Sequence, residues 1–275
     1  AECMNEEPSH YALNPSSELV ERAAKLAKAE SARKGEPEFH MTEDMRRLST
    51  PWSVSQVRAE QIQATDLPAG VILDAAAGSG VQLIALTTGL KRPGLAIELD
   101  PNIGLLCAAN MQITGDEADL QRTMDRVLIG DGTDAENAIV AYWNSLREAG
   151  TRAHPPIGML HLDPARPRDA QRHEIDEMEP AIGPVLRAWS NHLETGPRGP
   201  AILLDLSPRL NEDQRSLVDA VIETTFPGIP RTWEFLSQGG GRIDRLSVWI
   251  GSLSSKERSR CCLLYTSPSP RDSCA

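Results

Sequence analysis

From residue 71 onward, short unbroken apolar runs alternate with longer stretches in which apolar residues recur at helical spacing. The pattern predicts strands over residues 71–73, 94–99, 126–129, 158–162 and 201–206, and helices over 81–90, 103–113, 135–149, 175–192 and 212–224. This alternation predicts an α/β fold with a doubly wound, mostly parallel sheet. Unbroken apolar runs are typical of strands that are covered on both faces. Two last strands, 233–236 and 246–250, flank three consecutive glycines and predict a C-terminal antiparallel hairpin.

The first 49 residues are polar and charge-rich and predict a helical N-terminal segment. An amphipathic helix is expected over 19–32, and a shorter helix begins after Thr42, a residue type that caps helices. Thr50-Pro51 then opens a helix over 52–65 and, with it, an α/β domain over 50–255. The chain begins with Ala1, which leaves open that this segment is truncated.

The last fifteen residues differ from the rest of the chain. Cys262 to Asp272 resembles a translated sequencing-library adapter, so we expect residues 261–275 to be an artefactual, disordered tail. Of the five cysteines, only Cys3 and Cys107 then remain, too few for a disulfide framework or a zinc site. The six histidines show no ligand spacing, so no metal is expected.

Composition excludes several classes of protein. With 40% hydrophobic and 24% charged residues the chain is neither disordered nor fibrous. No apolar run reaches the roughly 18 residues of a membrane span, and no basic start precedes an apolar core, so we expect a cytoplasmic protein with no membrane partner. The formal net charge of -11 argues against broad attraction to nucleic acid, although it permits a local basic patch.

Each of the first four predicted strands ends in an acid: Asp74, Glu98, Asp131 and Asp163. Ligands of such sheets bind outside the carboxyl ends of the strands. An acid after the second strand suits the two hydroxyls of a ribose, and an acid after the third suits an exocyclic amine such as that of adenine. Taken singly, each acid could equally be a helix cap or a solvated loop residue.

The first turn, Asp74 to Gly80, contains two glycines that let a ligand approach the backbone closely. The turn contains no basic residue and lacks the Lys-Ser/Thr of a phosphate-binding loop, so a pyrophosphate is not the obvious ligand. Leu83 stands where a dinucleotide fingerprint has its third glycine, which disfavours an oxidoreductase. Acidic side chains around a positively charged ligand fit a sulfonium better than a phosphate.

Three segments, 71–80, 97–101 and 129–132, resemble in order and spacing the first three motifs of class I S-adenosylmethionine-dependent methyltransferases. The resemblance covers about residues 70–253 and implies a Rossmann-like sheet with S-adenosyl-L-methionine as cofactor. It implies that Gly78 and Gly80 border the methionine part, that Glu98 binds the ribose and that Asp131 contacts adenine. The cofactor-binding residues it implies are Asp74, Ala76, Gly78, Gly80, Glu98, Leu99, Asp131 and Gly132.

Asp163-Pro164-Ala165-Arg166 stands where class I enzymes acting on amino groups carry Asn/Asp-Pro-Pro-aromatic. The resemblance implies that Asp163 grips the amine. Arg166 replaces the aromatic residue and could stack on a base or fork a phosphate, or it could form an ion pair with Asp163 that only shapes the loop.

The fourth motif also resembles that of methyltransferases with a THUMP-like domain, which reads Asp-Pro-Ala-Arg-Arg. The segments 50–51, 179–180 and 206–208 fit that family too. Pro167 departs from it by replacing the second Arg, and Arg168, one position on, could substitute.

The expected function is therefore S-adenosylmethionine-dependent methyl transfer, with Asp163 and Arg166 as catalytic residues and a base amine of RNA (tRNA or rRNA) as acceptor. Cys107 lies mid-helix in a core context, which argues against a cysteine adduct and hence against methylation at pyrimidine carbon 5. Two alternatives stay open: a protein or small-molecule substrate, and an inactive cofactor fold that serves as an RNA-binding scaffold.

Overall fold

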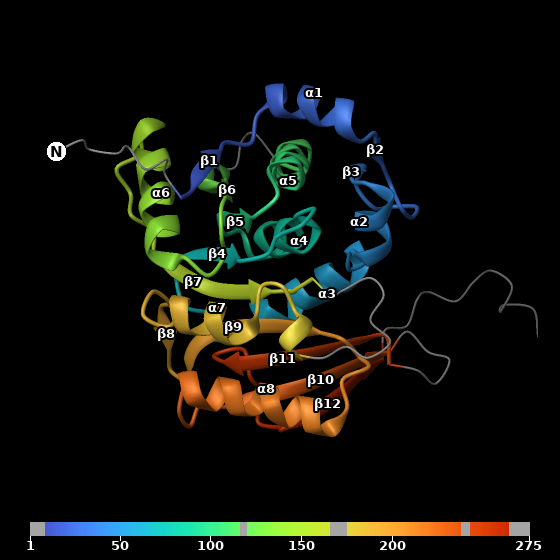
Figure 1. Cartoon of the computed structure of the whole chain (residues 1–275), viewed down its shortest axis with the longest axis vertical. Coiled ribbons are helices and arrows are strands. Elements are labelled where there is room, and N and C mark those ends of the chain that lie inside the picture. Colours follow the sequence, from blue (N-terminus) through green and yellow to red (C-terminus); the bar gives the residue numbers. More distant parts are fainter. Residues whose placement is uncertain (1–8, 116–119, 166–174, 238–242, 264–275) are drawn as a thin grey trace, which may run out of the picture.

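The computed structural model describes residues 9–115, 120–165, 175–237 and 243–263 (Figure 1). Within them, a ten-stranded sheet has the order β1-β6-β5-β4-β7-β9-β11-β10-β12, and β8 pairs with β9 off this path. These strands are β1 Tyr11–Leu13, β4 Val71–Asp74, β5 Gly94–Glu98, β6 Arg126–Ile129, β7 Ile157–Leu162, β8 Thr195–Gly196, β9 Gly199–Leu206, β10 Arg231–Ser237, β11 Arg245–Gly251 and β12 Ser259–Leu263. A second, two-stranded sheet consists of β2 Ala29–Glu30 and β3 Phe39–His40.

The five central strands are parallel to one another, and β11 runs antiparallel to both β9 and β10. The α-helices are α1 Ser17–Leu26, α2 Glu43–Leu48, α3 Trp52–Gln63, α4 Val81–Leu90, α5 Pro101–Ile113, α6 Ala135–Glu148, α7 Ile182–Trp189 and α8 Glu212–Thr225, with short 3-10 helices at Leu120–Met124 and Ile175–Glu177. This arrangement confirms the predicted α/β fold, mostly parallel and closed by antiparallel strands.

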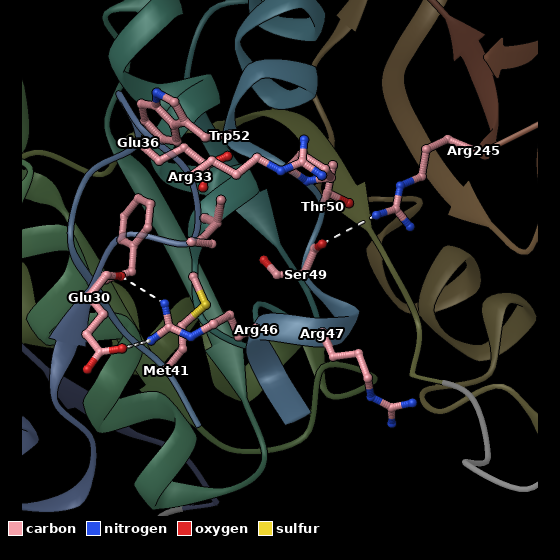
Figure 2. Close-up of a pocket in the computed structure, with 14 residues that line it drawn as sticks. Glu30, Arg33, Glu36, Met41, Arg46, Arg47, Ser49, Thr50, Trp52 and Arg245 are labelled. Atoms are coloured by element: carbon pink, nitrogen blue, oxygen red, sulfur yellow. Dashed lines mark hydrogen bonds and ion pairs between the residues drawn. The ribbon is translucent and has the colours of Figure 1, made fainter. Parts of the chain in front are cut away.

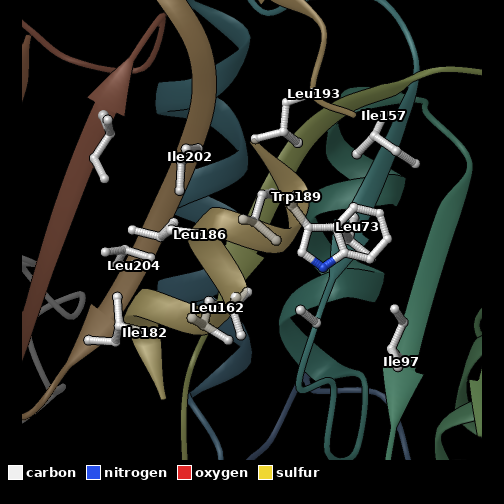
Figure 3. Packing of buried hydrophobic residues seen from close by; sticks show 14 of the residues in the cluster. Leu73, Ile97, Ile157, Leu162, Ile182, Leu186, Trp189, Leu193, Ile202 and Leu204 are labelled. Atoms are coloured by element: carbon white, nitrogen blue, oxygen red, sulfur yellow. The ribbon is translucent and has the colours of Figure 1, made fainter. Parts of the chain in front are cut away.

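Alternation along each strand divides the core between the two faces of the sheet. In β4, Val71 and Leu73 belong to one buried cluster and Ile72 to the other, because successive side chains of a strand point to opposite faces. Helices α6, α7 and α8 supply the first cluster, in which Trp189 packs among strand residues (Figure 3). Helices α3, α4 and α5 supply the second.

The N-terminal segment contains more than helices. Its strand β1 pairs antiparallel with β6 at one edge of the main sheet. Helix α1 is shorter than predicted: it begins after Ser16, whose side chain accepts from the backbone N–H of Leu19, and it ends at Leu26 because Ala27 is extended. The predicted helix over 175–192 is also wrong in extent, since Pro180 disfavours helical backbone at Glu179 and α7 starts only at Ile182.

The C-terminal tail is a second correction. The predicted disorder begins at residue 261, yet Cys261 to Leu263 belong to β12, which pairs in parallel with β10. The strand is held by an ion pair of 2.7 Å between Arg260 Nε and the Glu234 carboxylate, which is fully buried. Residues 264–275 lie outside the described residues, so the structure does not test the adapter-like remainder.

Candidate functional site

The turns after β4, β5 and β6 meet at the carboxyl edge of the sheet. The backbone N–H of Gly78 donates to Glu98 Oε2 at 2.9 Å, which ties the first turn to the second. The third turn lies against the first, because a Cβ on Gly132 would come within 2.1 Å of the Ala75 carbonyl oxygen. The sequence-predicted turns are therefore one contiguous surface.

Two glycines allow the first turn to take its shape. Gly78 has φ +52 and Gly80 has φ +77, both in the left-handed region that L side chains rarely adopt. A Cβ on Gly80 would also lie 2.7 Å from Cys107 Sγ, whereas a Cβ on Gly78 would meet nothing within 4 Å. Gly80 thus packs against α5, and Gly78 borders open space in which a ligand has room.

Glu98 connects the first two turns through its half-buried carboxylate. Besides the Gly78 bond, its Oε1 accepts from the backbone N–H of Asp100 at 3.1 Å. Burial raises the pKa of Glu98, and these backbone hydrogen bonds oppose the rise. The backbone of both turns therefore holds the Glu98 carboxylate, and its contact with a ribose stays a prediction.

The rest of the predicted cofactor surface combines apolar and acidic groups. Leu99 is 72% exposed, an unusual state for a large aliphatic side chain, and it directly follows Glu98. Asp131 is exposed, and its Oδ1 accepts from the backbone N–H and the hydroxyl of Thr133, both at 2.8 Å. Ala76 is half-buried in the first turn. The contact of Asp131 with adenine stays a prediction.

Asp74 does not face this open surface. It is only 2% exposed, its Oδ2 lies 2.8 Å from His161 Nδ1, and its Oδ1 accepts from the backbone N–H of Ala76 at 3.2 Å. The expectation that Asp74 contacts the cofactor directly therefore needs revision. Its carboxylate acts on the site through the backbone of the turn.

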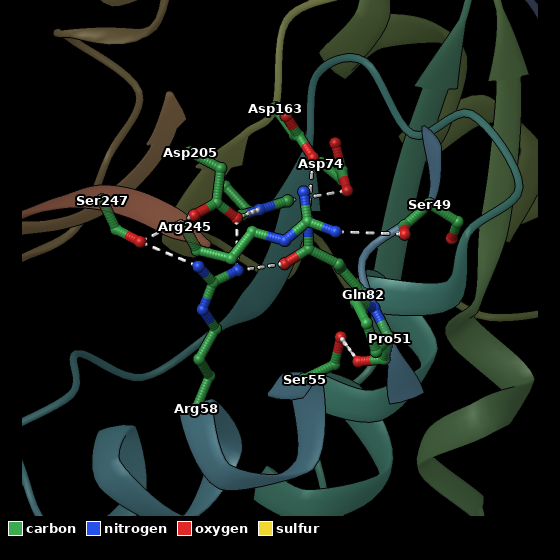
Figure 4. A network of polar contacts seen from close by, with 11 residues as sticks. Ser49, Pro51, Ser55, Arg58, Asp74, Gln82, Asp163, Asp205, Arg245 and Ser247 are labelled. Atoms are coloured by element: carbon green, nitrogen blue, oxygen red, sulfur yellow. Dashed lines mark hydrogen bonds and ion pairs between the residues drawn. The ribbon is translucent and has the colours of Figure 1, made fainter. Parts of the chain in front are cut away.

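His161 joins Asp74 to a deeper network of buried charges (Figure 4). Its second ring nitrogen, Nε2, lies 3.1 Å from Asp205 Oδ2. Carboxylates only accept, so both ring nitrogens donate and the ring is an imidazolium. Burial alone would lower the pKa of His161, but the two carboxylates outweigh it and raise the pKa to about 10.

Arg58 completes this network from α3. Its Nη1 donates to Asp205 Oδ2 at 2.5 Å and to Gln82 Oε1 at 2.6 Å, and its Nη2 donates to Ser247 Oγ at 2.8 Å. Burial would raise the pKa of Asp205, but Arg58 and then His161 hold it well below its usual range. In this network two cations and two anions therefore alternate.

The network ends at the candidate catalytic acid. Because Gln82 Oε1 accepts from Arg58, its amide Nε2 points the other way and donates to Asp163 Oδ2 at 3.1 Å. Asp163 is half-buried directly after β7. Just beyond it, Ala165 and Glu179 pair through two backbone hydrogen bonds of 2.7 and 3.0 Å. The structure thus brings Asp163 to the same edge as the glycine turn.

Arg166, Pro167 and Arg168 lie outside the described residues, so the proposed roles of these positions stay predictions. Cys107 is fully buried, and burial raises its pKa well above the usual range, which keeps the thiol protonated. The predicted inertness of this cysteine fits that environment.

The sequence reasoning missed Arg58, His161, Gln82 and Asp205. A signal was present, because His161 and Asp205 each interrupt an otherwise apolar strand, at 157–162 and 199–206. A charged side chain within a covered strand needs a partner of opposite charge. The sequence does not indicate which residue is that partner.

S-adenosylmethionine fits these residues by the chemistry of the donors. The open side of Gly78 leaves room beside the backbone, and Glu98 and Asp131 are the acceptors that hydroxyl and amine groups require. None of the three turns carries a basic side chain, so a cation is preferred to a phosphate. In the part of the chain that the structure describes, no group of three or more His, Cys, Asp or Glu side chains could hold a metal ion.

Comparison with solved structures places the fold. A crystal structure described as a methyltransferase from Porphyromonas gingivalis W83 aligns with a TM-score of 0.55 at 17% identity, covering 92% of this chain and 54% of that one. The chain therefore spans about half the length of that protein. This similarity supports the Rossmann-like fold of class I methyltransferases.

Two further similar structures have TM-scores below 0.5, and the fold assignment does not rest on them. One is a predicted O-methyltransferase from Agrobacterium tumefaciens, with 0.49 at 16% identity, covering 76% of this chain and 86% of that one. The other is described as a class I S-adenosylmethionine-dependent methyltransferase from Listeria monocytogenes, with 0.47 at 14% identity, covering 81% of this chain and 67% of that one.

No protein-family model matches the chain, and no curated protein matches it either. Among the described helices, none combines the length and apolar character that crossing a membrane requires.

Proposed function

We propose that this protein transfers a methyl group from S-adenosylmethionine to an exocyclic amine of an RNA base, in tRNA or rRNA. One observation carries the proposal: a glycine turn with open space at Gly78, acids without bases around it, and the Asp163 carboxylate all meet at one sheet edge. The resemblance of the fourth motif to THUMP-like methyltransferases supports RNA as the substrate class. The cytoplasmic location remains part of this proposal.

When bound, S-adenosylmethionine supplies a methyl group on a positively charged sulfur, and the amine nitrogen forms the C–N bond as the S–C bond breaks and its electron pair passes to sulfur. The Asp163 carboxylate accepts a hydrogen bond from the target amine and aims its lone pair at the methyl carbon. Gln82 Nε2 donates to Asp163 Oδ2 at 3.1 Å, which helps to orient this carboxylate toward the substrate. The proton that the amine loses passes to Asp163 or to water.

Positioning accounts for most of the catalysis that these residues offer. A carboxylate held by a buried network keeps one orientation, which lowers the entropy lost when the amine is aligned. Cys107 forms no adduct, because its thiol is buried and protonated. This favours a nitrogen or oxygen acceptor, which needs no covalent activation, and the Asp163 motif favours nitrogen.

The test combines the purified chain, S-adenosylmethionine with a labelled methyl group, and bulk RNA. Mass spectrometry of the digested nucleosides should find the label on the amino group of a base. Asp163→Ala should retain affinity for S-adenosylhomocysteine and lose turnover, since its contacts act on the amine during transfer. Tight NAD binding without any S-adenosyl ligand would refute the proposal, and full turnover in Asp163→Ala would remove the role of Asp163.

A further inference from the structure

A cavity of about 170 Å³ lies between the N-terminal segment and the start of α4 (Figure 2). Its walls come from the β2–β3 connection, α2, the start of α3 and the first residue of β11. The charged side chains in its walls are Arg33, Arg46, Arg47 and Arg245, with Glu30 and Glu36. We call it the arginine cavity. Its described lining includes none of the residues of the proposed cofactor site.

Two of the four arginines have an acidic neighbour: Arg47 Nη2 lies 3.7 Å from Asp44 Oδ1, and Arg46 lies beside Glu30. Arg46 Nη1 donates to the carbonyl oxygen of Glu30 at 3.0 Å, and the Glu30 carboxylate is 3.9 Å from Nη2. The Arg33 side chain is exposed and makes no hydrogen bond or ion pair with the described residues. A guanidinium has five N–H donors, so Arg33 and Arg46 keep donors for a ligand.

Size and charge together select the ligand. Pockets that enclose a whole small molecule measure roughly 300–1,000 Å³, so this cavity suits a group as small as a phosphate. Guanidinium forks match the oxygens of a phosphate in bidentate geometry. The cavity walls carry four arginines against two glutamates, so they are locally positive in a chain whose formal net charge is -11. An anion is attracted there although the net charge of the molecule is negative.

The cavity adjoins the proposed site of methyl transfer. Val81 lines it, and the next residue, Gln82, donates to Asp163. Arg245 reaches from β11 to the carbonyl oxygen of Ser49 at 3.3 Å, and both residues are drawn with the cavity and with the polar network (Figures 2 and 4). The cavity and Asp163 are thus connected through two successive residues of α4.

We propose that the arginine cavity binds a backbone phosphate of the RNA substrate, next to the nucleotide whose amine meets Asp163. This inference rests on the proposed function, because it takes the substrate to be RNA. It adds a binding site formed by the N-terminal segment. In this site the exposed Arg33 side chain and the Arg46 side chain, which Glu30 holds in place, both donate to the phosphate. The segment therefore contributes to substrate recognition and not only to the fold.

The experiment measures binding of a short fluorescein-labelled single-stranded RNA to the whole chain by fluorescence anisotropy over a range of salt concentrations. Arg33→Gln should weaken binding about tenfold at low salt and reduce the slope of log affinity against log salt by about 0.7, the loss expected for one phosphate contact on a single strand. Arg22→Gln is the matched control, because Arg22 is an exposed arginine of α1 outside the cavity. Melting temperature and affinity for S-adenosylhomocysteine should stay unchanged in both variants.

The outcomes separate the inference from the proposed function. Equal losses in Arg33→Gln and Arg22→Gln would show diffuse attraction and overturn the arginine cavity as a site. Unchanged RNA affinity in Arg33→Gln would also overturn it and leave the proposed function standing. A wild-type chain that binds S-adenosylhomocysteine but no RNA would overturn both the cavity inference and the RNA part of the proposed function.

Discussion

Replacing Arg58 with methionine should strongly destabilise the fold. Arg58 is 1% exposed and donates hydrogen bonds to three side chains, of which Asp205 is the only one with a formal charge. Removing one partner of a buried ion pair costs about 3–5 kcal/mol, because the other charge stays buried without compensation. His161 still lies 3.1 Å from Asp205, so we expect the lower end, about 3 kcal/mol.

Urea denaturation followed by circular dichroism measures this cost. The midpoint should fall while the slope with denaturant stays constant, as expected for a change in stability without a change in the exposed surface. Arg126→Met is the matched control. Arg126 is also buried, but it donates to the Ser145 hydroxyl and to backbone carbonyls, so its removal should cost less, about 1–3 kcal/mol.

A double-mutant cycle tests the cause. Asp205→Asn removes the negative charge, and the variant that combines it with Arg58→Met leaves the neutral pair of Asp74 and His161. The combined loss should therefore be smaller than the sum of the single losses, with a coupling of about 0.5–3 kcal/mol. A cost below about 1 kcal/mol for Arg58→Met, together with a coupling near zero, would refute the argument that this pair stabilises the fold.

Three further predictions concern other charges. The pKa of His161 is about 10 in the folded chain and about 6.5 in the unfolded chain. Its contribution to the free energy of unfolding is therefore complete below about pH 6.5, and it falls by about 1.4 kcal/mol per pH unit as the pH rises to about 10. Denaturation of His161→Gln should lack this dependence on pH. Burial raises the pKa of Glu98, so calorimetric affinity for S-adenosylhomocysteine should fall on acidification, and Glu98→Ala should lose about 1.5–3 kcal/mol of binding. Arg260→Met should destabilise the chain by about 3 kcal/mol in thermal and urea melts, because it leaves the buried Glu234 carboxylate without its cation. Replacing the exposed Arg258 with Met should not destabilise it. Equal stability of the two variants would show that β12 does not stabilise the fold.

The central sheet could be predicted because its signal is local. The apolar runs at 126–129 and 71–73 mark strands wherever both faces are covered, and the structure places β6 and β4 there. The edge strands β1 and β12 could not be found in this way. They are three and five residues long, and they pair with the sheet through backbone hydrogen bonds that any sequence can form. The Arg260–Glu234 ion pair that also holds β12 joins distant positions, which hydrophobic periodicity does not indicate.

For the candidate site, the structure shows where the predicted residues lie, and their roles stay predictions. Glu98 follows from the rule that ligands bind at the carboxyl ends of strands, and its contact with Gly78 agrees with it. The inward orientation of Asp74 could not be read from the sequence, because the last residue of a strand can turn to either side. The Arg58–Asp205 contact joins positions 147 residues apart, and hydrophobic periodicity contains no information about such pairs.

The buried network is connected to the acid at the sheet edge through Gln82. Within the network, His161 and Arg58 carry two positive charges, and Asp74 and Asp205 carry two negative ones, so these four side chains are neutral together. Because Arg58 fixes the direction of the amide that donates to Asp163, the orientation of that carboxylate depends on a charge pair in the core. A fold that must neutralise Asp205 thus also positions its surface acid, which links the stability of the core to the geometry of the site.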